Sequence, residues 1–252
     1  MQSYRNSPTF ALMETSVFRF KEFRVEHSRS SMKVGVDAVL LGAWAVSIKK
    51  EPYILDVGTG CGVIALMLAQ RYPAATIQGI DIDEASISEA QTNINNSPWG
   101  SRLSAALKRF PEDILNSSQR YDLIVSNPPF FDSGVKNPTT PREKARHQAA
   151  LSPYSLIENS PSLLNTGGSL CMIIPYEILA KVMKLVEEKG LCVNKVCYVK
   201  NNIKRPVKRV MIEIGFPKEK EDNVEVEHLI LFENGEPTPA YRALTGIFYL
   251  NM

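Results

Sequence analysis

The chain has 252 residues, of which 44% are apolar and 22% are charged. These ordinary globular values exclude a disordered or collagen-like chain and supply enough apolar side chains for a large core. The formal net charge of +2 does not by itself indicate a polyanionic partner. No stretch approaches the ~18 consecutive apolar residues that cross a bilayer, and no leader pattern opens the sequence. We therefore expect a cytoplasmic protein that makes no membrane contact.

The four cysteines are scattered, without a CxxC pair or the spacing of metal ligands. The three histidines join no nucleophile and acid in a hydrolytic triad pattern. We expect reduced thiols, no metal site and no nucleophilic catalysis, and nothing in the sequence indicates an obligate protein partner. The four cysteines are Cys61, Cys171, Cys192 and Cys197.

Short β-rich runs alternate with helical patterns from Tyr53 onward, which predicts an α/β fold with a doubly wound, mostly parallel sheet of seven strands. The last two strands have no helix between them and should pair as an antiparallel hairpin. Strands are expected at 53–57, 76–81, 103–108, 121–126, 169–174, 191–199 and 207–216, and helices at 63–71, 84–95, 153–164 and 176–189.

Two segments lie outside this pattern. Residues 1–50 are expected to form an N-terminal extension to a domain spanning 51–252. The tail of that domain predicts one more strand at 225–232 and a short helix at 240–248. Residues 130–152 form the longest stretch without periodicity, and structureless loops of such length in compact domains are usually functional or mobile.

A glycine-rich motif follows the first strand of the core, as it does in nucleotide-binding α/β proteins. Its glycines allow a tight turn and a close backbone approach to a ligand. The spacing is GxGxG rather than GxGxxG, and an acid stands at the strand end, where it would repel a pyrophosphate but attract an ammonium group. The motif therefore favours S-adenosyl-L-methionine over NAD. Its residues are Asp56, Gly58, Thr59, Gly60, Cys61 and Gly62.

Two further acids are candidates for the same cofactor. Asp81 ends the second strand of the core, the position from which a carboxylate accepts hydrogen bonds from ribose hydroxyls, and Ile82 beside it is assigned to the same site. Asp113, after the third strand, could accept a hydrogen bond from the adenine amino group or could cap a helix. Asp83 is more typical of a cap for the helix that starts at residue 84.

The tetrapeptide Asn127-Pro128-Pro129-Phe130 directly follows the apolar strand 121–126, at the edge of the sheet where ligands bind in open α/β folds. Consecutive prolines remove two N–H donors and make the loop a rigid acceptor. The Asn127 side-chain oxygen and the Pro128 carbonyl could take both protons of a planar NH2 group, and Phe130 could stack on its ring. The motif predicts methylation of an amide or exocyclic amino nitrogen, with Asn127 close to the cofactor as well.

These motifs together resemble class I methyltransferases of the adenine-N6 and glutamine-N5 type. Segments outside the core are similar to the bacterial tRNA1(Val) (adenine-N6)-methyltransferase family, and this likeness covers nearly the whole chain. The segments are 18–27, 32–44, 142–147, 208–210, 241–244 and 248–250. The chain differs from many members in reading Ser28-Arg29 after His27.

The resemblance implies methylation of N6 of the adenine at position 37 of a valine tRNA. It also implies that the extension 1–50 packs on the cofactor and substrate side of the catalytic domain 51–252, with Lys33, Gly35 and Asp37 beside the methionine end of the cofactor. Basic residues cluster in two places where phosphates could be neutralised. The predicted RNA contacts are Arg142, Lys144, Arg146 and His147 in the long loop, and Lys204, Arg205, Lys208 and Arg209 between the last two core strands.

Three other functions remain open at this stage. A protein glutamine-N5 methyltransferase or a guanine-N2 rRNA methyltransferase would use the same two acceptors. A non-catalytic RNA-binding module that retains the cofactor is the third alternative. The basic loop favours RNA over protein as the substrate, and the intact Asn127–Phe130 loop favours catalysis.

Overall fold

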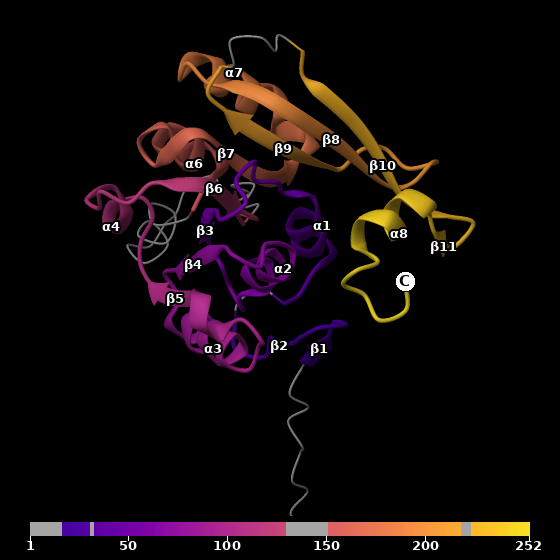
Figure 1. The fold of residues 1–252 in the computed structure, drawn as a ribbon. Helices are drawn as coiled ribbons and strands as arrows, with labels where there is room; N and C mark the ends of the chain where they lie inside the picture. Colours follow the sequence, from indigo (N-terminus) through magenta and orange to yellow (C-terminus); the bar gives the residue numbers. More distant parts are fainter. Residues whose placement is uncertain (1–16, 31–32, 130–150, 218–222) are drawn as a thin grey trace, which may run out of the picture.

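The computed structural model describes residues 17–30, 33–129, 151–217 and 223–252. Within these residues, nine strands form one sheet in the order β11-β10-β8-β9-β7-β6-β3-β4-β5 (Figure 1). Its strands are β3 (Tyr53–Val57), β4 (Thr76–Asp81), β5 (Leu103–Leu107), β6 (Tyr121–Ser126), β7 (Leu164–Pro175), β8 (Cys192–Asn202), β9 (Arg209–Gly215), β10 (Glu225–Glu233) and β11 (Glu236–Pro237). The doubly wound α/β class expected from the sequence is confirmed.

The pairing follows the prediction, and the sheet is wider than expected. Strands β3 to β7 are parallel to one another, and β9 pairs antiparallel with both β7 and β8. The predicted tail strand becomes β10, which joins the same sheet parallel to β8, and β11 adds a short edge pairing. The expected seven strands therefore become nine.

Helices cover both faces of the sheet (Figure 1). They are α1 (Val36–Trp44), α2 (Val63–Arg71), α3 (Glu84–Asn95), α4 (Glu112–Leu115), α6 (Pro153–Asn159), α7 (Leu179–Glu188) and α8 (Pro239–Thr245), with short 3-10 turns at Gly100–Arg102, Ser160–Ser162 and Tyr176–Ile178. Alternate strand residues point to opposite faces. In β3, Ile54 therefore packs in the core with α1, α2 and α8, whereas Leu55 packs in the core with α6 and α7.

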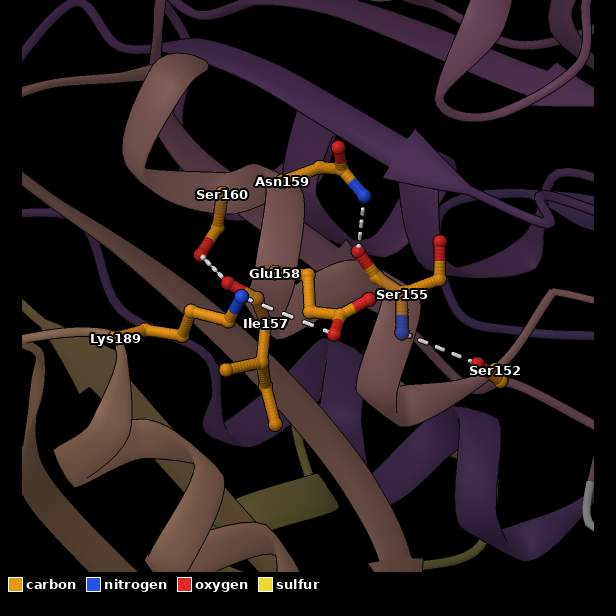
Figure 2. Close-up of polar contacts among 7 residues, drawn as sticks. All are labelled: Ser152, Ser155, Ile157, Glu158, Asn159, Ser160 and Lys189. Carbon is orange, nitrogen blue, oxygen red and sulfur yellow. Dashed lines mark hydrogen bonds and ion pairs between the residues drawn. The ribbon is translucent and has the colours of Figure 1, made fainter.

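Helix α6 is shorter than the predicted helix 153–164. Ser152 caps its start by accepting a hydrogen bond from the Ser155 amide at 3.1 Å (Figure 2). Pro153 stands in the first turn. At its end, the Asn159 side chain donates back to the Ser155 carbonyl at 2.8 Å, and the Ser160 hydroxyl donates to the Ile157 carbonyl. Pro161 follows, and a proline interrupts α-helical hydrogen bonding. The chain therefore changes to a 3-10 turn and enters β7.

The segment before the core is held by two polar side chains of α3. Two short strands, β1 (Val17–Arg19) and β2 (Arg24–Glu26), form a separate antiparallel pair. Buried Glu89 accepts hydrogen bonds from the amides of Ser28, Arg29 and Ser30 at 2.7 to 2.9 Å. One turn further on, the amide group of Asn93 bonds both the carbonyl and the N–H of Glu26 at 2.8 Å. We refer to Glu89 and Asn93 as the α3 anchor.

Aromatic side chains join this segment to the end of the chain. Phe20 stacks on Phe23 with ring centroids 4.5 Å apart, and it forms an isolated β-bridge with Tyr249. The Lys21 amide donates to the Phe248 carbonyl at 2.8 Å. Since Phe20 and Phe248 are buried in the core beneath α2, both ends of the described chain contribute to that core.

Replacing Glu89 with glutamine should destabilise the fold. Burial raises the pKa of Glu89, but hydrogen bonds from the amides of Arg29, Ser30 and Ser28 outweigh this effect and hold its pKa below the usual value. Glutamine has one acceptor oxygen, so its NH2 group would face at least the Ser30 amide, at a cost on the order of 2 kcal/mol. A depressed acid pKa stabilises the fold above the unfolded pKa, and this stabilisation is lost as the pH falls through the folded pKa.

Urea unfolding at pH 7 and at pH 4 measures this effect. The Glu89→Gln variant should unfold at lower urea than the parent at pH 7, and the difference should shrink at pH 4. Glu51→Gln is the matched control, because Glu51 is exposed. Equal urea midpoints for Glu89→Gln and Glu51→Gln at pH 7 would contradict the role of the anchor.

Candidate active site

The turn between β3 and α2 has the backbone that its glycines predict. Gly58, Gly60 and Gly62 have φ values of 71°, 54° and 83°, in the left-handed region that favours glycine. The amides of Gly58 and Thr59 both donate to the Ile80 carbonyl at 2.9 Å. A Cβ on Gly79 would lie 2.7 Å from the Thr59 hydroxyl oxygen. The turn therefore lies tightly against the end of β4.

Asp56 is fully buried beneath this turn. The Thr59 hydroxyl donates to its Oδ2 at 2.7 Å, whereas its buried Oδ1 has no hydrogen-bond partner among the described residues. Burial raises the pKa of Asp56 to about 7, against the opposing effects of the Thr59 hydroxyl and of the Ala65 backbone amide at the start of α2. An acid in this state is suited to pairing with a cationic group, which would favour its ionised form.

Asp81 ends β4 and faces the same turn. Its Oδ2 accepts a hydrogen bond from the Gly60 amide, and its Oδ1 accepts one from the Asp83 amide, both at 3.0 Å. Each carboxylate oxygen can accept a second bond, so capacity for two hydroxyl donors remains. The Asp83 side chain instead accepts from the Ser86 amide at 2.9 Å, which confirms Asp83 as the cap of α3.

A small cavity opens beside Asp81. It is lined by Gly58, Asp81, Ile82, Lys108, Phe110 and Leu151, together with Val57 and Ile80. Ile82 is 53% exposed, so the cavity offers an apolar side chain next to a carboxylate. Asp113 does not line it: this exposed residue accepts a hydrogen bond from the Arg109 amide at 2.7 Å. That contact is a local turn cap, and a role for Asp113 toward adenine stays a prediction.

The end of β6 places Asn127 next to the glycine turn. The buried Ser126 hydroxyl donates to the Val57 carbonyl at 2.8 Å, which joins the ends of β6 and β3. The Asn127 side-chain oxygen is buried and has no hydrogen-bond partner among the described residues. Pro128 is buried and Pro129 half-buried, while Phe130 lies outside the described residues. Buried polar atoms normally find partners, so an orphan acceptor at this edge indicates a ligand contact.

The segment 33–37 leads into α1. Gly35 is the residue before the helix, and Lys33 is exposed. Asp37 forms an ion pair with Arg209, with 2.8 Å between Oδ2 and Nε. The sequence assigned Asp37 to the cofactor and Arg209 to RNA, and the structure brings the two together. His27 accepts a hydrogen bond from the Val34 amide at 3.2 Å, which ties this segment to β2.

The second basic cluster lies mainly at the same edge of the sheet. Strand β8 ends there and β9 begins there, because Arg209 pairs with Pro175 at the end of β7. Lys204, Arg205 and Lys208 are exposed in the connecting loop. Lys195, near the start of β8, instead pairs with Glu227 at 2.9 Å and with Glu225 at 3.3 Å on a face of the sheet. The first basic cluster, Arg142, Lys144, Arg146 and His147, lies outside the described residues.

Comparisons with known proteins identify the family. A model of the methyltransferase small domain matches residues 38–192. A tRNA1(Val) (adenine(37)-N6)-methyltransferase of Christiangramia forsetii is 37% identical over 95% of this chain and all of its own length. Proteins of the same name from Flavobacterium psychrophilum and Vibrio vulnificus are 39% and 35% identical, over 94% and 95% of this chain and 100% and 98% of their own lengths. The chain belongs to this methyltransferase family.

Solved structures agree on the fold. A predicted O-methyltransferase of Agrobacterium tumefaciens superposes with a TM-score of 0.62, covering 84% of this chain and 96% of its own at 17% identity. A precorrin-6y C5,15-methyltransferase of Geobacter metallireducens superposes with a TM-score of 0.51, covering 78% and 95% at 16% identity. These identities are low, so the two structures support the architecture alone.

Three residues that support this methyltransferase site were not predicted from the sequence. Ser126 joins β6 to β3, and the α3 anchor residues Glu89 and Asn93 hold the N-terminal segment. Asn93 also donates to the Cys61 carbonyl at 2.9 Å, which links the anchor to the glycine turn. A polar pair spaced i, i+4 on a helix is usually interpreted as a solvated face. Glu89 and Asn93 bind residues 59 to 67 positions away in the sequence, and contacts at that separation leave no local sequence pattern.

Other sequence expectations concern thiols, metals and membranes. All four cysteines are free, and burial raises the pKa of the Cys61 thiol to about 12, so it stays protonated. Among the described residues, no group of three or more His, Cys, Asp or Glu side chains could hold a metal ion. None of the described helices is both long and apolar enough to cross a membrane.

The raised pKa of Asp56 predicts a pH dependence of stability without cofactor. Between about pH 4 and pH 7 the folded protein keeps a proton that the unfolded chain releases, so the free energy of unfolding falls as the pH rises. Relative to Asp56→Asn, which cannot titrate, the parent should lose about 2–3 kcal/mol between pH 5 and pH 8. Urea unfolding of both proteins measures the difference. Parallel stability profiles would show that Asp56 is ionised throughout.

Proposed function

We propose that the protein transfers a methyl group from S-adenosyl-L-methionine to N6 of an adenine in tRNA, the adenine at position 37 of a valine tRNA. The single observation that carries this proposal is the buried Asn127 side-chain oxygen, which has no partner among the described residues. It stands at the carboxyl end of β6, next to the glycine turn. The names of the relatives support the choice of adenine and of tRNA.

Asn127 is suited to activating a planar amine. The nitrogen of an exocyclic amino group is a weak nucleophile while its lone pair is delocalised into the ring. The Asn127 oxygen would accept one amine proton and the Pro128 carbonyl the other, because proline supplies an acceptor but no N–H donor. Both hydrogen bonds favour a pyramidal nitrogen with an available lone pair. Phe130 is proposed to stack on the extruded base.

The chain's own residues fit the proposed cofactor. The orphan Asp56 oxygen beneath the turn would attract its ammonium group, and Asp81 would accept hydrogen bonds from its ribose hydroxyls. Ile82 and Phe110 would contact its adenine in the small cavity. When bound, the cofactor supplies an electrophilic methyl group. The proposed contacts also include the turn residues Gly58, Thr59, Gly60, Cys61 and Gly62, and Asn127, Asp113, Lys33, Gly35 and Asp37.

The N-terminal extension is proposed to belong to the same site. The α3 anchor holds residues 26–30 close to Cys61, and the chain continues from there to Lys33 and Asp37. Residues 1–50 would therefore pack on the cofactor and substrate side of the catalytic domain 51–252. The Asp37–Arg209 ion pair would connect this extension to the basic loop.

Basic residues at the sheet edge favour RNA over a protein glutamine as the substrate, and the names of the relatives favour an adenine in tRNA over a guanine-N2 position in rRNA. The exposed loop 203–208 carries three cations and no acid. Such a loop would neutralise phosphates and position the RNA, with Arg142, Lys144, Arg146 and His147 proposed as further contacts. A tRNA substrate implies a cytoplasmic enzyme. A non-catalytic RNA-binding module would give the buried Asn127 side-chain oxygen no ligand to bind.

Asn127→Ala should nearly abolish methylation while cofactor affinity stays close to that of the parent. Loss of one well-placed polar stabiliser typically costs on the order of 10²–10³ in rate. Asn127→Asp keeps an acceptor oxygen at the same place and should retain more activity than the alanine variant. Single-turnover methylation of tRNA, paired with cofactor calorimetry, measures both effects. A normal rate for Asn127→Ala would refute the proposed acceptor role.

Affinity for tRNA should fall steeply as salt rises, since phosphate neutralisation releases counterions. Arg205→Ala should weaken binding and reduce the slope of log affinity against log salt by about 1. Lys49→Ala is the matched control, because Lys49 is exposed before β3, at the opposite edge of the sheet. Fluorescence titration over a salt series checks this. Identical slopes for both variants would exclude the loop from the RNA interface.

A further inference from the structure

Three aromatic side chains form a row that the proposed reaction does not use. Tyr198 in β8 stacks on His228 in β10, with ring centroids 5.3 Å apart and an interplanar angle of 20°. Tyr176, the first residue after β7, meets Tyr198 edge-on with centroids 6.2 Å apart. We refer to Tyr176, Tyr198 and His228 as the aromatic row.

Strand register places this row level with the acceptor loop. Ser126 pairs with Met172, Ile174 pairs with Val210, Val210 pairs with Tyr198, and Tyr198 pairs with His228. Ile174 lies two residues after Met172 in β7, so the residues aligned with it, Tyr198 and His228, lie two residues further along the sheet than Ser126, at the level of Pro128. Tyr198 and His228 lie three and four strand spacings from β6, about 14 and about 19 Å away.

The row is accessible from solvent. Tyr176 is 47% exposed, and His228 is exposed at a position where β10 has no second neighbouring strand among the described residues, because β11 pairs only with residues 232 and 233. Val226, two residues before His228 on the same face of β10, is 54% exposed. Only Tyr198 is held between strands, where it packs partly against the core. The row therefore presents ring surface along an open face.

The charge around the row is mostly positive. Lys200 lies two residues after Tyr198 and therefore on the same face of β8. The Tyr176 amide donates to the Lys208 carbonyl at 3.1 Å, which places the first ring beside the basic loop. Glu177 is an exposed acid next to Tyr176. Exposed rings beside cations complement a single strand of nucleic acid, whose bases stack and whose phosphates are negative.

We propose that unpaired nucleotides flanking the target base stack on the aromatic row, with Tyr176 and His228 as platforms and Lys200 and Lys208 near their phosphates. The identity of the RNA in this inference rests on the proposed function, whereas the stacking of bases on the rings does not. The row would hold a single-stranded loop a few nucleotides from the base that enters the acceptor loop. Readout by stacking is tolerant of sequence, so the row contributes affinity and orientation.

The experiment uses the full chain and two alanine variants, Tyr176→Ala and His228→Ala, with Tyr176→Phe and His228→Phe as ring-preserving controls. Tyr198 is left unchanged because it packs against the core. The probes are a fluorescent anticodon stem-loop oligoribonucleotide and the same hairpin with abasic residues flanking the target adenine. Each alanine change should weaken binding of the intact hairpin by about 5- to 150-fold, which corresponds to ~1–3 kcal/mol per stacked base. The phenylalanine variants should bind within a few fold of the parent.

The abasic hairpin separates stacking from other effects. It should bind the parent weakly, and the alanine changes should weaken it little further. Alanine variants that bind the intact hairpin as the parent does would overturn the proposal, and so would an equal loss on both hairpins. Methylation of tRNA by the parent tests the proposed function separately. If the parent methylates tRNA but the alanine changes do not affect binding, the stacking proposal is rejected and the proposed function stands. If binding depends on the rings but tRNA is not methylated, the stacking proposal stands and the proposed function is rejected.

Discussion

The turn between β3 and α2 is the constraint on which the site depends. Three left-handed glycines let this turn fold over the end of β4, where two of its amides share the Ile80 carbonyl. Three other elements bind to this turn or to the strand end before it. Asp81 accepts a hydrogen bond from the Gly60 amide, the Ser126 hydroxyl donates to the Val57 carbonyl, and the Asn93 side chain donates to the Cys61 carbonyl. Moving this turn would shift the acid, the acceptor loop and the N-terminal segment together.

Two buried polar atoms at this site have no hydrogen-bond partner in the described part of the chain. Among the described residues, three buried side-chain oxygens are unpaired: Asp56 Oδ1 and Asn127 Oδ1 lie at the site, and Gln70 Oε1 lies in α2. An unsatisfied buried acceptor costs free energy that a stable fold would otherwise avoid. Both atoms lie at the carboxyl edge of the sheet, one beneath the turn and one beside it. We interpret them as the cofactor side and the substrate side of one reaction centre.

Local patterns predicted much of the fold and the centre of the site. The boundaries of β3, α2, β4, α3 and β6 follow directly from apolar runs, glycines and the Asp83 cap. Helix α6 was predicted too long because back-bonding by Asn159 and Ser160 ahead of Pro161 ends it early. The place of β10 in the sheet could not be predicted, because pairing between distant strands leaves no local pattern. Ion pairs between distant residues, such as Asp37 with Arg209 and Lys195 with Glu227, could not be predicted from the sequence for the same reason.

Product analysis tests the central claim most directly. The protein is incubated with S-adenosyl-L-methionine carrying a labelled methyl group and with unmodified valine tRNA, and the RNA is digested to nucleosides. The account predicts label in N6-methyladenosine, mapped to position 37 and lost when that adenine is replaced. Label in N2-methylguanosine or no transfer to RNA would contradict it.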